Sequence, residues 1–349
     1  MAQIDKPNLH FNTILYTGDG NSTKTLTGVG FQPDWIWIKN RTDGHWHNIT
    51  DAVRGTAKTL VSNSNSAEVA NATSGYVSAF GTDGFTVTGG SSNKEEVNTS
   101  SDNYVVWNWK ANGQGSSNTD GSINTTYTSV NTTAGFSIVS FTGTGSNATV
   151  GHGLGVAPKV IITKSRANNE NWGFYHESTG NQKQLVLNND HALSGASSAY
   201  YNNTSPTSTV FSVGTADSTN DAANMVAYCF AEKKGYSKFG SYTGNGNSNG
   251  PFIYTGFKPA FFIMKETTDA STNWIMYDNK RSPSNDVEKY LKPNSGSAES
   301  TGLNFDFYSN GIKCRNANAG INASGQNYIY MAFAENPIVG SNNIPAVGR

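Results

Sequence analysis

Two histidines one residue apart come closest to a metal-binding motif in this sequence. His45 and His47 would lie on one face of a β-strand, where two imidazoles can bind one metal ion. No third histidine, cysteine or cluster of carboxylates accompanies them in the sequence. The alternative is a pair of exposed polar residues on a strand. We therefore predict that the protein has no metal site.

Other patterns that could carry catalysis are incomplete. The segment Gly151–Gly155 (GHGLG) resembles a phosphate-binding loop, but the Lys-Ser/Thr that ends such a loop is absent, so we predict a turn. Asp51, His176 and Asp278 lie at near-equivalent positions of an internal repeat, yet a catalytic centre would not change residue type between copies. No Gly-x-Ser-x-Gly elbow and no carboxylate pair stands out. We predict no enzymatic activity, no catalytic residues and no cofactor.

Three tryptophans are the candidate ligand-binding residues. Trp46, Trp172 and Trp274 each close one copy of the internal repeat. An exposed indole ring can stack on a sugar, which would make the three residues glycan-binding platforms. The alternative is that each tryptophan belongs to a core or to an interface between domains, at an equivalent position in each copy. The sequence favours the core and leaves the glycan platform as the alternative.

The tryptophans belong to a stretch that occurs three times, over residues 16–46, 141–172 and 242–274. Each copy begins with an aromatic residue followed by Thr-Gly-x-Gly. A proline follows the aromatic residue after 17 positions (16 to 33, 141 to 158 and 242 to 259), and a lysine follows each proline after six. The lysines are Lys39, Lys164 and Lys265. Two fixed spacings in three copies indicate an internal triplication.

The repeated residues predict β-strands. Each proline precedes a short run of aromatic and β-branched residues, typical of a buried strand, and the lysine at its end is predicted to snorkel or to form an ion pair. The glycines of Thr-Gly-x-Gly should turn the chain between strands. The predicted strands include 11–16, 35–38, 104–109, 160–162, 225–230, 261–263 and 328–333. We therefore predict an all-β protein of three tandem β-sandwich domains of the jelly-roll or lectin-like type.

The repeats also predict the domain boundaries. Residues 111–134 are rich in Asn, Ser, Thr and Gly, and form either a flexible linker or a loosely paired hairpin. No linker separates the second and third repeats, which should pack rigidly. The predicted segments are an N-terminal arm at 1–10, β-sandwich repeats at 11–110, 135–235 and 236–336, and a C-terminal arm at 337–349. Either arm could dock on another protein.

The composition restricts the classes of partner. Charged residues make up 14% of the 349 residues, against about 25% in ordinary globular proteins. The net charge of −1, without a basic block, argues against binding of nucleic acid. No apolar run is long enough to span a membrane, and the first residues lack the apolar region of a signal peptide. We expect a protein made in a reducing cytoplasm; whether Cys229 and Cys314 are free stays open.

Several stretches resemble a known family. FQPDWIWIKNR at 31–41, AGFSIVSFTGTGSNATVGHGLGVAPKVIITKSR at 134–166 and the closing FAENP at 333–337 are similar to a repeat domain of uncharacterised function. That domain occurs in virion proteins of tailed bacteriophages, many of them phages of marine cyanobacteria. The resemblance covers residues 11–336, is weakest in the third copy, and offers no catalytic residues. It implies a structural or adhesion module of a virion.

We therefore expect a non-enzymatic protein of the bacteriophage virion surface, made in the host cytoplasm. It would be a capsid decoration, a head fibre or a component of a tail fibre, with other capsid or tail proteins as partners. A homotrimer is compatible with a fibre. The alternative is a lectin-like, carbohydrate-binding adhesin of the tail that binds a host surface glycan. The sequence does not distinguish the head from the tail.

Overall fold

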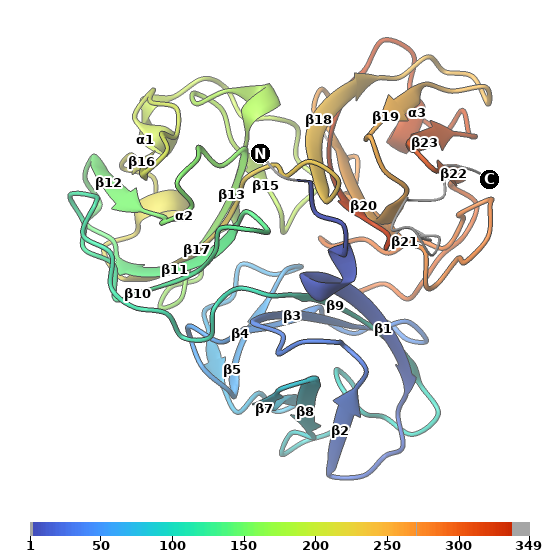
Figure 1. The fold of residues 1–349 in the computed structure, drawn as a ribbon, viewed down its shortest axis with the longest axis horizontal. Helices are drawn as coiled ribbons and strands as arrows, with labels where there is room; N and C mark the ends of the chain where they lie inside the picture. Colours follow the sequence, from blue (N-terminus) through green and yellow to red (C-terminus); the bar gives the residue numbers. More distant parts are fainter. Residues whose placement is uncertain (1–2, 270, 337–349) are drawn as a thin grey trace.

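The chain forms three units, each built from a larger and a smaller antiparallel β-sheet (Figure 1). The computed structural model describes residues 3–269 and 271–336, so the predicted C-terminal arm lies outside the described residues. We define unit 1 as residues 11–110, unit 2 as 111–235 and unit 3 as 236–336. The all-β prediction is confirmed. None of the helices among the described residues is long and apolar enough to span a lipid bilayer.

In unit 1 the larger sheet has the strand order β1-β9-β3-β4-β5-β6 and the smaller sheet the order β2-β8-β7. The strands are β1 (Phe11–Thr17), β2 (Thr23–Thr27), β3 (Trp35–Asn40), β4 (Asn48–Asp51), β5 (Lys58–Val61), β6 (Val69–Ala70), β7 (Tyr76–Gly81), β8 (Gly84–Thr88) and β9 (Asn103–Trp109).

In unit 2 the larger sheet has the order β10-β11-β17-β13-β14-β15, and β12 pairs with β16. The elements are β10 (Tyr127–Asn131), β11 (Phe136–Thr142), β12 (Ala148–Gly151), β13 (Val160–Ser165), β14 (Gly173–His176), the 3-10 turn η2 (Glu177–Thr179), β15 (Leu185–Val186), α1 (Ser198–Tyr201), β16 (Val210–Val213), α2 (Asp217–Asn220) and β17 (Asn224–Phe230). The flexible-linker alternative for 111–134 is wrong, because β10 pairs along β11 and extends the larger sheet.

In unit 3 the larger sheet has the order β18-β24-β20-β21 and the smaller sheet the order β19-β23-β22. The elements are β18 (Ser237–Thr243), β19 (Phe252–Tyr254), β20 (Pro259–Glu266), β21 (Ile275–Asp278), β22 (Phe305–Tyr308), β23 (Gly311–Cys314), α3 (Ala319–Asn322) and β24 (Asn327–Ala334). In all three units the last strand (β9, β17 or β24) therefore lies between the strand that precedes the Thr-Gly-x-Gly turn (β1, β11 or β18) and the strand at the repeat proline (β3, β13 or β20).

The Thr-Gly-x-Gly segment turns the chain from the larger to the smaller sheet, as predicted. A Cβ atom on Gly18 would lie 1.9 Å from the carbonyl oxygen of Thr99, and Gly20 has φ +73°. The first glycine thus permits a close approach, and the second adopts a left-handed conformation. Buried Asn98 fixes the turn, because its side-chain oxygen accepts a hydrogen bond from the N–H of Asp19 (3.1 Å). Asn220 and Asn322 bind the N–H groups of Thr144 and Asn245 in the same way.

The central strands are buried on both faces. All six residues of β3 are buried. Trp35 and Trp37 point into a core shared by the three units, whereas Ile36 and Ile38 point into the core between the two sheets of unit 1. A strand covered on both faces needs a continuous apolar run rather than alternation, which accounts for the Trp-Ile-Trp-Ile sequence.

Aromatic contacts join the units at the shared core. The ring centroids lie 4.7 Å apart between Trp35 and Tyr228 of units 1 and 2, 4.6 Å between Phe174 and Trp274 of units 2 and 3, and 5.4 Å between Phe11 and Phe333 of units 1 and 3. Burial of each such side chain contributes roughly 1.5–3 kcal/mol. The three units therefore fold against one another and not as separate beads.

The N-terminal arm lies on the chain itself. Its 3-10 turn η1 (Pro7–Leu9) leads into β1, and the N–H of Ile4 donates to the carbonyl of Lys234 (3.1 Å). The imidazole of His10 meets the ring of Tyr236 edge to face at 5.9 Å. Residues 3–10 are thus docked on the connection between units 2 and 3.

Candidate functional site

The three repeat lysines are buried among neutral oxygen atoms. The ammonium of Lys39 donates to the carbonyls of Asn40 (2.5 Å) and Asp43 (3.2 Å). Lys164 donates to the carbonyls of Ser165 (2.7 Å) and Asn168 (3.2 Å), and Lys265 to the carbonyl of Glu266 (2.7 Å) and the hydroxyl of Thr272 (2.9 Å). The prediction that these lysines snorkel is wrong, because all three side chains are fully buried.

Burial gives these lysines unusual acidity. It lowers the pKa of Lys39, Lys164 and Lys265 to about 8 in each unit. A lysine with such a pKa is partly neutral near physiological pH and could act as a nucleophile if a substrate reached it. The ammonium groups are closed off from solvent, and each instead ties the loop after its strand to the strand end.

The repeat tryptophans occupy two kinds of environment. Trp172 and Trp274 are 0% and 1% exposed, which leaves no ring face for a sugar. The indole N–H of Trp172 donates to the carbonyl of Val61 in unit 1 (2.9 Å), and that of Trp274 to the carbonyl of Val186 in unit 2 (2.9 Å). These two tryptophans are interface residues. Trp46 is 49% exposed and is the one repeat tryptophan whose ring a ligand can reach.

The predicted equivalence of Trp46 with the other two tryptophans is wrong. The backbone N–H groups of Trp172 and Trp274 donate to the side chains of Asn188 and Asn294. In unit 1 the residue that makes this bond is His47, which donates to Asn63. His47 therefore stands where the other units have tryptophan. It is buried, and its Nδ1 accepts a hydrogen bond from the indole of Trp37 (2.9 Å).

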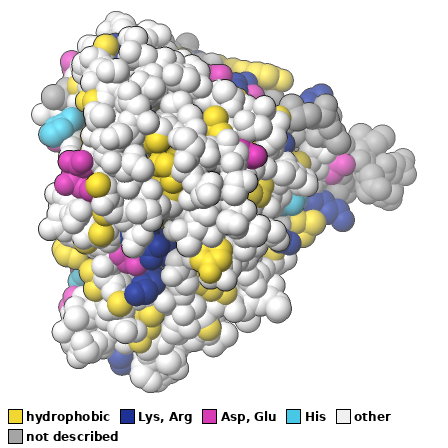
Figure 2. Space-filling model, turned by 90° about the vertical axis from the view of Figure 1, so that its left-hand side faces the viewer, with side chains coloured by type: hydrophobic (Ala, Val, Ile, Leu, Met, Phe, Trp, Pro, Cys, Tyr) yellow, Lys and Arg dark blue, Asp and Glu magenta, His cyan; other side chains and the backbone are white. Residues whose placement is uncertain are grey.

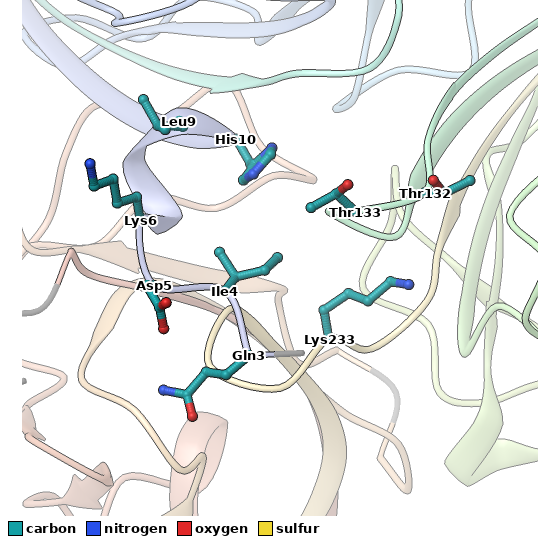
Figure 3. A pocket seen from close by; sticks show the side chains of 9 residues that line it. All are labelled: Gln3, Ile4, Asp5, Lys6, Leu9, His10, Thr132, Thr133 and Lys233. Carbon is teal, nitrogen blue, oxygen red and sulfur yellow. The ribbon is translucent and has the colours of Figure 1, made fainter. Parts of the chain in front are cut away.

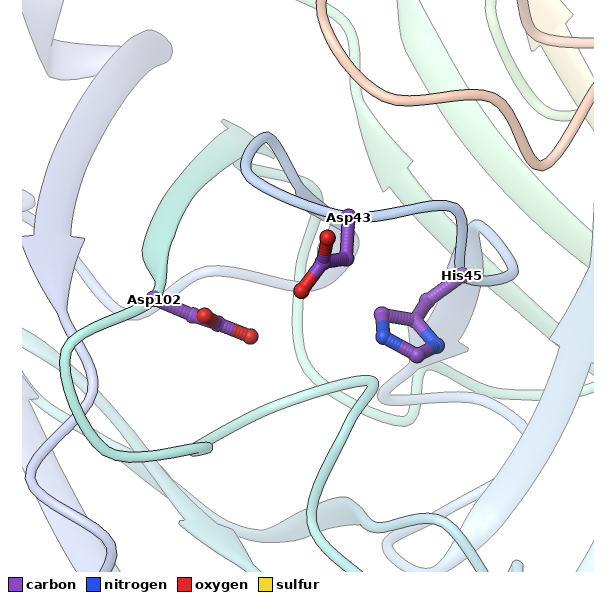
Figure 4. A group of neighbouring side chains, drawn as sticks. All are labelled: Asp43, His45 and Asp102. Carbon is purple, nitrogen blue, oxygen red and sulfur yellow. The ribbon is translucent and has the colours of Figure 1, made fainter.

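His45 and His47 do not form the pair that their spacing suggested, because neither lies on a strand. His45 instead turns toward Asp43 and Asp102, and ligand atoms of these three side chains lie within 4.8 Å of one another (Figure 4). Two carboxylates and an imidazole are donors that a divalent cation accepts. However, the Asp102 carboxylate already accepts from the amide of Asn40 (2.8 Å), and the ammonium of buried Lys39 lies under the same loop.

A buried ion network joins units 1 and 2. Asp51 and Arg54 form an ion pair without solvent exposure, and Arg54 also binds Glu68 (3.0 Å). Arg166 of unit 2 donates to both oxygens of Glu68 (2.9 and 3.0 Å), and the hydroxyl of Tyr228 donates to Asp51 (2.7 Å). Burial raises the pKa of Glu68, but the hydrogen bond from Arg166 and the charge of Arg54 outweigh burial and lower it overall.

An equivalent network joins units 3 and 1. Asp278 pairs with Arg281 (2.6 Å), and Arg281 binds Glu299 (3.2 Å). Arg41 of unit 1 binds Glu299 with two hydrogen bonds of 2.8 and 2.9 Å, and the indole of Trp107 donates to Asp278 (3.1 Å). The pKa of Glu299 is also lowered, because its arginine partners outweigh the effect of burial.

The third interface, between units 2 and 3, has neutral residues at the same places. His176 stands at the position of Asp51 and Asp278, and its Nε2 lies 3.2 Å from the carbonyl of Tyr330. Thr179 follows His176 where the other units have arginine. Leu193 and Thr267 replace the glutamate and the second arginine, since the Leu193 N–H bonds to the Thr267 carbonyl as Glu68 does to Arg166. Burial lowers the pKa of His176 to about 4.

A surface pocket of about 420 Å³ lies where the N-terminal arm crosses the chain (Figure 3). The side chains of His10, Lys6 and Lys233 line it together with those of Thr132 and Thr133. The pKa of His10 is lowered, first by burial and then by the charge of Lys110. The pocket thus combines imidazole and ammonium groups at the meeting point of the arm and unit 2.

Part of this arrangement could be found from the sequence. The equivalence of Asp51, His176 and Asp278 was recognised, and the structure places all three at interfaces between units. The arginines were missed, although Arg54 and Arg281 both follow their aspartate after three residues.

Cys229 and Cys314 are free and buried in different cores.

The comparisons with known proteins give one match. No curated protein and no solved structure matches the chain. A family model described as a domain of unknown function (DUF7483) matches residues 6–337, which span all three units. The chain therefore belongs to the DUF7483 family.

Proposed function

We propose that the protein is a non-enzymatic structural protein of the bacteriophage virion surface, either a capsid decoration or head fibre, or a component of a tail fibre. The observation that carries the proposal is how the buried ionisable groups are used. The carboxylates of Asp51 and Asp278 accept hydrogen bonds from a neighbouring unit, and Glu68 and Glu299 form ion pairs with arginines of a neighbouring unit. Such use favours a rigid building block over a reactive centre.

The resemblance of the repeat motifs to virion proteins supports the same proposal. We also propose that the three units descend from one triplicated jelly-roll or lectin-like domain, since they share the strand order around the repeat lysine. Partners would be other virion proteins, and the location would be the particle. Three fused units could take the place of a trimer, and a homotrimer of the chain stays an alternative.

The surface fits a particle exposed to salt water. Charged side chains are few on the face in Figure 2, most of which is white, the colour of the backbone and of side chains that are neither hydrophobic nor charged. Exposed ion pairs contribute little and are screened by salt, so a neutral polar surface loses nothing in a saline medium. The buried networks are screened much less, because the arginine–carboxylate pairs of Asp51 and Asp278 lie away from solvent.

The test is the composition and the map of the particle that this chain would belong to. We expect the chain among the proteins of density-gradient-purified phage particles, and three-lobed density at the capsid or tail in a cryo-electron microscopy map. Major capsid protein serves as the positive control, and an abundant host protein as the control for contamination. A chain that stays in the lysate while the particles are complete would contradict the proposal.

A further inference from the structure

The smaller sheet of unit 3 exposes aromatic side chains on its outer face. Phe252 and Tyr254 of β19 are 46% and 64% exposed. Tyr308 of β22 lies on the same face, because Gly311 of β23 pairs with Tyr254 on one side and with Tyr308 on the other. The sheet lies on the side of unit 3 away from the centre of the molecule (Figure 1). Neighbouring exposed rings of this kind mark a binding surface more often than scattered apolar residues do.

The rings form a shallow platform over a glycine. A Cβ atom on Gly311 would lie 2.5 Å from the ring of Phe252, so this ring lies across the glycine. The centroids of the Phe252 and Tyr308 rings are 6.3 Å apart, with 51° between their planes. The face therefore offers the surface of neighbouring aromatic rings that are tilted against each other.

Fixed polar groups border the rings. The guanidinium of Arg315 donates to the hydroxyl of Tyr308 (2.7 Å) and to the carboxylate of Asp306. The hydroxyl of Tyr308 in turn donates to Asp306 (3.0 Å). Lys313 lies between Phe252 and Asp306 in the strand register. Hydrogen-bond donors and acceptors thus stand in set positions beside the apolar surface.

The fold itself does not require aromatic residues at this place. Unit 1 builds the equivalent sheet with Thr23, Thr25 and Thr27 exposed on β2. In unit 2 the segment before β10 covers the equivalent strand, since Ile123 bridges to Val150 and the N–H of Ser122 donates to Thr149. Among the three units, the open aromatic face belongs to unit 3.

We propose that Phe252, Tyr254 and Tyr308, with Asp306 and Arg315, form a binding site for a neutral pyranose sugar of a glycan. One face of such a sugar presents C–H groups, which pack on an aromatic ring, while its edge presents hydroxyls. Those hydroxyls would donate to Asp306 and accept from Arg315. The site goes beyond the structural role proposed above and does not depend on it.

Two other occupants fit the same face less well. β19 has three residues, which is short for pairing with a strand of a peptide. A stable interface with a second copy buries about 800 Å² on each partner, and its core is depleted of charged residues. Here charged side chains interrupt the apolar surface on the same strand as an aromatic ring, on the next strand or directly after it. They are those of Asp306, Lys313 and Arg315.

The test is saturation-transfer difference NMR with the full chain and glucose, galactose, mannose and N-acetylglucosamine, as monosaccharides and as short oligomers. We expect at least one of them to bind with a dissociation constant in the millimolar range. The double variant Phe252→Ala, Tyr254→Ala should weaken binding at least tenfold, and Asp306→Asn should weaken it less. Trp46→Ala, which removes an exposed aromatic residue of unit 1, is the matched control and should leave binding unchanged.

Each other outcome overturns the site. Absence of a signal for all the sugars would do so, as would loss of binding in Trp46→Ala with retention in the double variant. Concentration-dependent self-association that the double variant abolishes would assign the face to a second copy. Tyr254→Ala alone removes the more exposed ring and keeps the test valid if the double variant fails to fold.

Discussion

Within the described residues, two of the three interfaces between units contain a buried network of arginines and carboxylates, and the third has neutral side chains at the same places. The networks around Arg54 and Arg281 each combine two carboxylates with two guanidinium groups. At the same places the interface of units 2 and 3 has His176, Thr179, Leu193 and Thr267. The backbone contacts are alike, because the N–H of Leu193 binds the carbonyl of Thr267 as Glu68 binds Arg166. The same backbone arrangement is therefore compatible with a charged or a neutral set of side chains at the interface.

The difference shows what the charges do. Removing two charges from water costs several kcal/mol for each ion, and their mutual attraction repays this cost only with complete hydrogen bonding. The third interface closes without that cost, so the networks are not needed to hold two units together. We infer that they determine which faces pair, since an arginine of one unit fits only the interface that presents the matching glutamate.

The largest effect is expected from breaking one network. Arg54→Ala should lower the free energy of unfolding by about 3–5 kcal/mol, because it leaves the Asp51 carboxylate buried without its partner. The measurement is unfolding in urea at pH 7, followed by circular dichroism.

The matched control is Thr179→Ala at the neutral interface. Thr179 donates one hydrogen bond to the carbonyl of His176 (2.8 Å), so its loss should cost about 1 kcal/mol. Equal losses in the two variants would show that the ion network is no more important than a neutral contact at the same position.

The sequence predicted the parts of the fold in which a strand fixes the number of residues between two repeated positions. The repeat proline and the lysine keep a constant spacing because one strand, β3, β13 or β20, occupies the residues between them, and its register leaves no room for insertion. The assignment of Trp46 failed because a loop separates Lys39 from β4, and a loop tolerates a shift of one residue. His47, eight residues after Lys39, matches Trp172, eight residues after Lys164.

The shared core was beyond what the sequence alone could predict. Non-alternating runs such as Trp35–Ile38 signal a strand covered on both faces. They do not say whether a second sheet, a helix or another unit provides the cover. The same limit applies to the ion networks, because the partner of Glu68 lies 98 residues away at Arg166 (166 − 68) in a different unit. The exposed face of unit 3 was missed because alternation in the three-residue strand β19 is too short to read.

As the pH decreases, the interface of units 2 and 3 should lose stability at a higher pH than the two charged interfaces. The folded pKa of His176 is about 4, below the ordinary value of 6.5, so the unfolded chain binds a proton that the folded chain does not. Stability from this group is complete above pH 6.5 and falls by about 3 kcal/mol as the pH decreases to 4. Glu68 and Glu299, with lowered pKa values, lose their contribution only below about pH 4.5.

The variant His176→Asn isolates this contribution. Its side-chain oxygen can still accept the hydrogen bond that Ser178 donates to His176. Between pH 6.5 and 4 the variant should lose less stability than the wild type; His10, His47 and His152, whose pKa values burial also lowers, supply the remaining slope. Urea unfolding at pH 7, 6, 5 and 4.5 measures both proteins, and identical pH profiles would refute the role of His176.

The smallest effect on stability is expected when the side chains of one interface are replaced by those of another. The transplant replaces the charged set between units 1 and 2 by the residues found between units 2 and 3, as Asp51→His, Arg54→Thr, Glu68→Leu, Arg166→Thr and Tyr228→Met. The last change follows from Met331, which pairs with Ile263 in unit 3 as Tyr228 pairs with Ile162 in unit 2. Replacing a whole buried network is often neutral or stabilising, whereas removal of one member is not. We expect stability within about 1.5 kcal/mol of the wild type, far above that of Arg54→Ala. A loss as large as that of the single variant would mean that the charges themselves hold these two units together. The neutral interface would then need a different source of stability, of which the tilted ring pair of Phe174 and Trp274 is the nearest candidate.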